Sequence, residues 1–110
     1  MSDTTREIDV EQFASTHAQD ATVIDVREAA EYAQGHVPGA LLVPMGQLPG
    51  HVENLNSDEP VYVICASGNR SAAMTDLLTQ SGIDAYSVSG GTTTWASSGR
   101  PLATGTHTTS

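Results

Sequence analysis

Four short runs of mostly apolar, partly β-branched residues recur along this chain, and segments with helical spacing separate them. The runs cover residues 22–25, 40–43, 61–64 and 85–88, and residues 6–8 are predicted to add a short edge strand. Such short runs are typical of strands that are buried on both faces. Strands that alternate with helices require crossover connections, which are right-handed. The sequence therefore predicts an α/β fold with a mostly parallel five-stranded sheet and helices on both of its faces.

The intervening segments supply the predicted helices. Asp9 is placed to cap a helix that begins at Val10, because a side-chain oxygen at this position can accept hydrogen bonds from the first turn. Glycines at 35 and 82 end two further helices, since glycine commonly follows a helix end. The predicted helices cover residues 10–17, 28–34, 46–54, 71–80 and 91–97.

The length and composition suit one domain. A chain of 110 residues with 38% hydrophobic residues can bury one modest core. We expect the domain to cover residues 5–102, with flexible polar tails at 1–4 and 103–110. No apolar run reaches the 18 residues that a membrane-spanning helix needs, and the first residues lack the basic start and apolar run of a secretory signal. The sequence thus favours a cytoplasmic protein without a membrane partner.

The charge and the cysteine count exclude several classes of function. The net charge is −9, with four arginines, no lysine and 13 acidic residues. Such a chain repels nucleic acid and anionic membranes. A single cysteine allows no internal disulfide and no zinc site with several thiolates, and the four histidines are scattered. We predict neither a metal nor a cofactor.

Two polar residues lie at the carboxyl ends of predicted strands, Asp25 at one and Cys65 at another. In open parallel sheets, sites form outside the carboxyl ends of the strands. This geometric rule predicts that Asp25 and Cys65 lie at the same edge of the sheet.

The segment after the third run carries the chemistry. It begins with Cys65 and leads through the small residues Ala66, Ser67 and Gly68 to the start of a helix. Small residues allow backbone N–H groups to converge above the sulfur, and Gly68 can adopt backbone angles that other residues avoid. The positive end of the next helix and the charge of Arg70 add to the positive potential around the sulfur. We predict a lowered pKa for Cys65, and therefore a nucleophilic thiolate. The competing interpretation is an inert, buried cysteine.

At this point the chain resembles the rhodanese family from about residue 8 to residue 102. Three blocks carry the resemblance. The first comprises Ile24-Asp-Val-Arg-Glu28, Glu31-Tyr32 and Gly35-His-Val-Pro-Gly-Ala40. The second is Cys65-Ala-Ser-Gly-Asn-Arg-Ser71, and the third comprises Gly90-Gly91, Trp95 and Ser98-Gly-Arg-Pro101.

The resemblance implies a sulfurtransferase. Cys65 would take a sulfur atom from thiosulfate or a similar small anionic donor, and it would hold this atom as a persulfide. Cyanide, a small thiol or a protein thiol would then remove it. Arg70 would orient the donor, and the loop amides would hold the outer sulfur. The implied binding residues are Ala66, Ser67, Gly68, Asn69, Arg70 and Ser71.

Two residues of the first block receive supporting roles. Asp25 is expected to accept hydrogen bonds from loop N–H groups. Arg27 is expected to pair with Glu31 one helical turn on, with donor binding as its alternative role. His36 is expected to bond locally within its turn, and Trp95 to lie in the core.

Two other functions stay open. A cysteine phosphatase or arsenate reductase also uses a thiolate below an anion-binding loop, but it has five residues between Cys and Arg, whereas Cys65 and Arg70 enclose four. A sulfur-relay or binding module would deliver the persulfide to one protein partner. Apolar residues on the surface near the site would favour the relay, and a bare pocket open to solvent would favour small donors.

Overall fold

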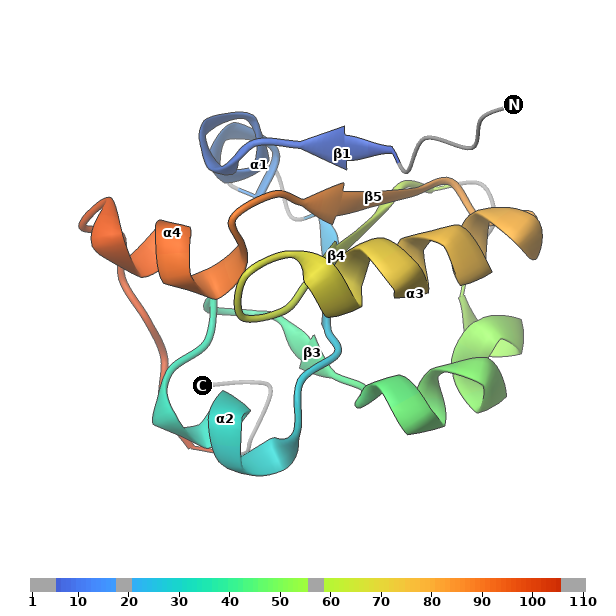
Figure 1. The fold of residues 1–110 in the computed structure, drawn as a ribbon, viewed down its shortest axis with the longest axis horizontal. Coiled ribbons are helices and arrows are strands. Elements are labelled where there is room, and N and C mark those ends of the chain that lie inside the picture. The colour runs from blue at the N-terminus through green and yellow to red at the C-terminus, as the bar shows by residue number, and fades with distance from the viewer. Residues whose placement is uncertain (1–5, 18–20, 56–58, 106–110) are drawn as a thin grey trace.

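The predicted parallel sheet is present in the structure, a computed structural model that describes residues 6–17, 21–55 and 59–105 (Figure 1). Its order is β1-β5-β4-β2-β3, and every neighbouring pair is parallel. The strands are β1 (Glu7–Ile8), β2 (Thr22–Asp25), β3 (Leu41–Leu42), β4 (Val61–Ile64) and β5 (Ala85–Val88). The strand predicted over 40–43 is shorter than expected, because only Leu41 and Leu42 pair with β2.

The helices follow the predicted segments with small shifts. They are α1 (Val10–His17), α2 (Ala29–Gln34), the 3-10 helix η1 (Met45–Asn54), α3 (Asn69–Gln80) and α4 (Gly91–Ser97). Helix α2 begins one residue late, because Glu28 serves as its N-cap in a capping box with Glu31. Helix α3 begins two residues earlier than predicted, because the backbone turns at Gly68, which has a φ of 113°.

Two cores lie on opposite faces of the sheet. On one face, Phe13 of α1 packs with Tyr62 of β4 and Trp95 of α4. The Phe13 ring centroid lies 6.0 Å from that of Tyr62 and 5.5 Å from that of Trp95. On the other face, Leu48 of η1 and Leu78 of α3 cover alternate residues of the same strands. The predicted helices on both faces are therefore confirmed. This arrangement places β4, with Cys65 at its end, in the middle of the sheet.

The chain stays attached to the domain beyond residue 102. Ala103 and His36 exchange two backbone hydrogen bonds, of 2.8 and 2.9 Å, and the Gly105 N–H donates to the Ala33 carbonyl. Our expected tail at 103–110 is thus ordered in its first three residues. Residues 1–4 and 106–110, the rest of the expected tails, lie outside the described residues. No helix in the described part of the chain is long and apolar enough to cross a bilayer.

Candidate active site

Cys65 lies where β4 ends, and the loop that follows folds back over its sulfur. The N–H groups of Gly68 and Ser71 donate to Sγ at 3.1 and 3.3 Å. The Ser71 hydroxyl oxygen lies 3.5 Å from the same sulfur. Ser71 is the third residue of α3, so the first turn of this 12-residue helix directs a free N–H at the sulfur. The predicted convergence of amides on Cys65 is therefore present.

These contacts favour the charged form of the sulfur. Burial raises the pKa of the Cys65 thiol, but hydrogen bonds from the Ser71 hydroxyl and from the amides of Ser71, Gly68 and Ser67 outweigh it. The pKa of Cys65 consequently lies below that of an ordinary thiol, as the sequence predicted.

The loop closes over the sulfur more tightly than the sequence suggested. Cys65 is only 1% exposed, while Ser67 and Asn69 in the same loop are exposed. The loop residues that follow Cys65, namely Ala66, Ser67 and Gly68, have small side chains.

Helix α4 holds the loop from the other side. The N–H groups of Thr92 and Thr93 donate to the carbonyls of Cys65 and Ala66 at 2.8 and 3.0 Å. This close approach needs a glycine at 91, because a Cβ there would lie 2.4 Å from the Cys65 carbonyl oxygen. Gly91 also has a φ of 57°, which side chains disfavour. The glycine pair 90–91 therefore lets one helix end support the loop.

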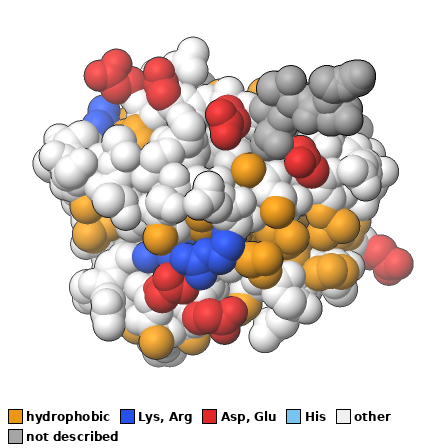
Figure 2. Space-filling view, viewed as in Figure 1, with side chains coloured by type: hydrophobic (Ala, Val, Ile, Leu, Met, Phe, Trp, Pro, Cys, Tyr) orange, Lys and Arg blue, Asp and Glu red, His pale blue; other side chains and the backbone are white. Residues whose placement is uncertain are grey.

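Arg70 makes a bidentate ion pair with Glu31 of α2. Its two terminal nitrogens lie 2.8 and 2.9 Å from the carboxylate oxygens, and both side chains are partly exposed. The hydrogen bond from Arg70 lowers the pKa of Glu31 to about 2. The blue surface in Figure 2 is arginine alone, because the chain has no lysine. Acidic and hydrophobic side chains adjoin the larger blue patch.

Asp25 and Arg27 form a buried ion pair with each other. The Arg27 side chain donates to the Asp25 carboxylate at 2.8 and 2.9 Å, and the Arg27 backbone N–H adds a bond of 3.1 Å. Arg27 also donates to the Gly35 carbonyl at 2.8 Å. The predicted pairing of Arg27 with Glu31 is wrong. The Arg27 guanidinium pairs with Asp25, two residues earlier, and Glu31 pairs with Arg70. Asp25 does accept a loop N–H, namely that of Arg27.

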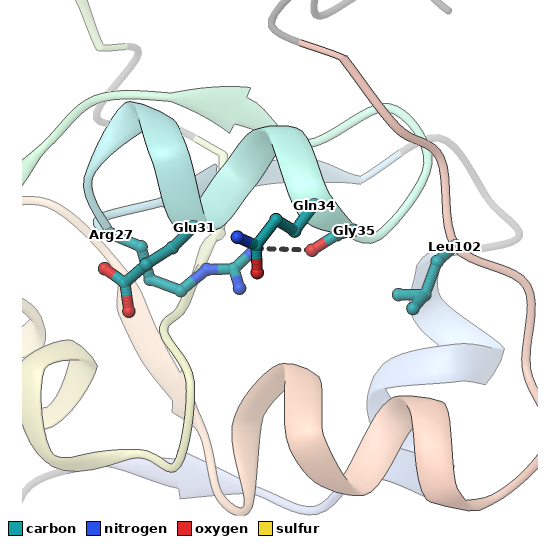
Figure 3. A pocket seen from close by; sticks show the side chains of 5 residues that line it. All are labelled: Arg27, Glu31, Gln34, Gly35 and Leu102. Carbon is teal, nitrogen blue, oxygen red and sulfur yellow. Dashed lines mark hydrogen bonds between the residues drawn. The ribbon is translucent and has the colours of Figure 1, made fainter.

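A surface pocket of about 280 Å³ opens between α2 and the C-terminal segment. Its lining residues are Arg27, Glu31, Gln34, Gly35 and Leu102. In Figure 3 the Arg27 side chain runs toward the Gly35 carbonyl, Gln34 lies beside it, and Leu102 stands apart on the other side. Glu31 is the link to the sulfur site, since it lines this pocket and binds Arg70. The pocket thus lies beside the loop and not directly over the sulfur.

The two remaining residues with sequence-based expectations take local roles. His36 is fully buried, its Nδ1 lies 2.8 Å from the Tyr32 carbonyl oxygen, and its ring stacks on that of Tyr32 at 3.6 Å. Trp95 is in the core and donates to the Pro101 carbonyl at 2.7 Å.

Sequence reasoning missed one side chain near the sulfur. The hydroxyl of Ser87, on β5, lies 2.8 Å from the Ser71 hydroxyl, and both residues are fully buried. One feature of the sequence could have indicated it: Ser87 is a polar residue in a predicted buried strand, and its side chain shares a face with that of Ala85, two residues earlier.

Comparisons with known proteins agree with this geometry. The model of the rhodanese-like domain family matches residues 9–98. A sulfurtransferase of Allochromatium vinosum is 35% identical over 99 residues, which cover 87% of this chain and 92% of that protein.

Solved structures give the same result. A rhodanese-related protein from Thermoplasma volcanium is 34% identical with a TM-score of 0.83, covering 89% of this chain and 97% of that one. A thiosulfate sulfurtransferase from Pseudomonas aeruginosa is 28% identical with a TM-score of 0.83 over 92% of this chain, but only 20% of that chain is covered.

Proposed function

Since the chain belongs to the rhodanese-like domain family, we propose that it transfers sulfane sulfur as a persulfide on Cys65. The family and the similar sulfurtransferase support sulfur transfer in general. The observation that carries the specific proposal is the pair of amides, from Gly68 and Ser71, that donate to Sγ. These donors stabilise a negatively charged sulfur, which is the form that attacks a donor and the form that a persulfide takes.

The reaction is a double displacement. The Cys65 thiolate attacks the outer sulfur of thiosulfate, the S–S bond of the donor breaks, and sulfite leaves with the electron pair. A new Sγ–S bond forms, and the negative charge remains on the outer sulfur. Cyanide then attacks this outer sulfur, leaves as thiocyanate and restores the thiolate. A thiolate acceptor would take the sulfur in the same way and leave as its own persulfide.

Arg70 and the rest of the loop bind the anionic donor in this proposal. The arginine is partly exposed beside the loop, and its planar group suits the oxygens of an oxyanion. The donor has to compete with Glu31 for this arginine, because Glu31 occupies two of its donor nitrogens. The remaining loop residues, Ala66, Ser67 and Asn69, offer backbone N–H groups and no bulk.

Intact-mass spectrometry after incubation with thiosulfate tests the proposal. The wild-type chain is expected to gain the mass of one sulfur atom, which cyanide then removes. Cys65→Ser is expected to gain none, and because Cys65 is the only cysteine the assignment is unambiguous. An unchanged wild-type mass with thiosulfate and with other sulfane donors would show that Cys65 does not carry sulfur.

The same loaded protein distinguishes a free enzyme from a relay component. Hydrophobic side chains adjoin the arginines in Figure 2, and the partly buried Met45, Met74 and Leu77 pack on the face that α3 and η1 share. Such a surface favours a protein thiol as acceptor. If a small thiol discharges the persulfide rapidly, the chain acts alone. If discharge by small thiols is slow, a protein acceptor is required.

A further inference from the structure

We propose that Ser87 is a positioning residue for the Cys65 thiolate, acting through the hydroxyl of Ser71. The proposal rests on the proposed role of Cys65 as the sulfur nucleophile. Ser87 is outside the loop and outside every block that carries the family resemblance, and within the described part of the chain it makes no hydrogen bond to the sulfur. It reaches the site only through Ser71, at 2.8 Å.

The argument begins with the placement of Ser87 in the sheet. Its register partner on β4 is Val63, two residues before Cys65, so the side chains of Val63, Cys65 and Ser87 share one face of the sheet. Val63, Cys65 and Ala85 on this face belong to one apolar cluster. A fully buried hydroxyl among apolar groups is unfavourable unless it makes a hydrogen bond. Ser87 makes that bond to Ser71.

The second step counts protons on Ser71. A hydroxyl has one proton to donate and can accept two hydrogen bonds. The Ser71 oxygen has three polar neighbours: the Gly68 carbonyl at 3.1 Å, the Ser87 hydroxyl at 2.8 Å and Cys65 Sγ at 3.5 Å. The carbonyl can only accept, so in the thiol form Ser71 donates to it. Ser71 then accepts from the thiol and from Ser87.

The third step follows the change to a thiolate. The charged sulfur can no longer donate and instead needs donors, so the Ser71 proton turns from the Gly68 carbonyl to Sγ. Ser87 must be the donor to Ser71 in both forms, because the single Ser71 proton is in use in each. A hydroxyl that accepts a hydrogen bond is a stronger donor. Ser87 therefore strengthens the bond from Ser71 to the charged sulfur.

Titration of the single thiol tests this role without relying on sulfur transfer. The ultraviolet absorbance of the thiolate is followed against pH, and the Cys65→Ser protein supplies the tyrosine background. Ser87→Ala is expected to move the titration to higher pH, so that the ratio of thiolate to thiol at a fixed pH falls about three- to tenfold. The control is Thr75→Val, which removes another fully buried hydroxyl of α3 that has no hydrogen-bond partner among the described residues. This control should leave the titration unchanged.

A double mutant tests the route through Ser71. If Ser87 acts through Ser71, adding Ser87→Ala to Ser71→Ala should cause no further change in the titration. Two results would overturn the proposal: a Ser87→Ala titration that coincides with the wild type, or effects of the two substitutions that add in full. If the wild-type chain gains no sulfur in the mass experiment but Ser87→Ala still moves the thiol titration to higher pH, only the proposed function is rejected.

Discussion

At the scale of single residues, Glu31 controls how free the Arg70 guanidinium is to bind another anion, because it occupies both terminal nitrogens. The ion pair lies beside the loop, and its partners are 39 residues apart in the chain. The lowered pKa of Glu31, about 2, means that the carboxylate stays charged down to acidic pH. A pKa below the ordinary value stabilises the folded state at pH values above that ordinary value, and this stabilisation disappears as the pH falls through about 2. Above pH 4, Glu31 should therefore not contribute to the pH profile of activity.

Removing the charge of Glu31 should improve the binding of an anionic donor. Glu31→Gln keeps an oxygen that can accept in the capping box of α2, but it frees Arg70 and removes a repulsive charge from the pocket. We expect the KM for thiosulfate to fall about two- to fivefold at low salt, and the difference to shrink at high salt.

Arg70→Ala should raise the KM and lower turnover while the fold persists. Steady-state kinetics at two ionic strengths measure both effects.

The control for this pair of variants is Glu11→Gln, which makes the same charge change at an exposed position of α1. Its KM should match that of the wild type. If Glu31→Gln raises the KM instead, the prediction is wrong, and Glu31 holds Arg70 in place for the donor and does not compete with the donor for it. A fully active Arg70→Ala would remove Arg70 from the donor site altogether.

At the scale of elements, the catalytic loop depends on how closely the end of α4 approaches it. The bonds from Thr92 and Thr93 to the carbonyls of the loop exist only because residue 91 lacks a side chain. The amides that bind the sulfur lie in this same loop. Moving α4 should therefore disturb the sulfur site, although no group of α4 makes a hydrogen bond to Cys65 Sγ within the described part of the chain.

Gly91→Ala is expected to lose persulfide formation together with stability. The new Cβ would meet the carbonyl oxygens of Cys65 and Ala66 at 2.4 and 2.7 Å, and the positive φ adds about 1–2 kcal/mol of strain. The matched control is Gly99→Ala, which has a φ of 84° but no atom within 4 Å of its new Cβ. Denaturant unfolding and intact mass after thiosulfate are measured for both. Equal loading by the two variants would show that the contact of α4 does not shape the sulfur site.

The elements themselves were largely predictable, because their signals are local. Strands β2, β4 and β5 and helices α1 and α4 have the predicted bounds, since short apolar runs and helical spacing depend only on neighbouring residues. The amide contacts to Cys65 were also predicted from the strand–loop–helix order. The pairing of Glu31 with Arg70 and of Ser71 with Ser87 was not, because these residues meet only after the sheet has formed. A serine in a strand gives no local indication of its partner.

At the scale of the whole molecule, one buried ion pair ties the carboxyl edge of the sheet to α2. Asp25 ends β2 beside the central strand β4, with which it pairs at Ile64. Arg27 connects this carboxylate to the Gly35 carbonyl after the end of α2. Both side chains are at least nine-tenths buried, and a buried carboxylate that lacks its cation is strongly destabilising because it has lost its hydration. The stability of the domain should therefore depend strongly on Arg27.

Replacing Arg27 with methionine separates this structural role from donor binding. Arg27→Met should lower the free energy of unfolding by about 3–5 kcal/mol, because it leaves the Asp25 charge buried without a cation. The control is Arg6→Met, which breaks the exposed ion pair with Asp84 and should cost about 1 kcal/mol or less. Urea unfolding measures both, and the KM of the folded fraction should be unchanged in Arg27→Met if the residue only holds structure. A stable Arg27→Met protein with a raised KM for thiosulfate would instead assign Arg27, at the edge of the pocket beside the loop, to the binding of the donor.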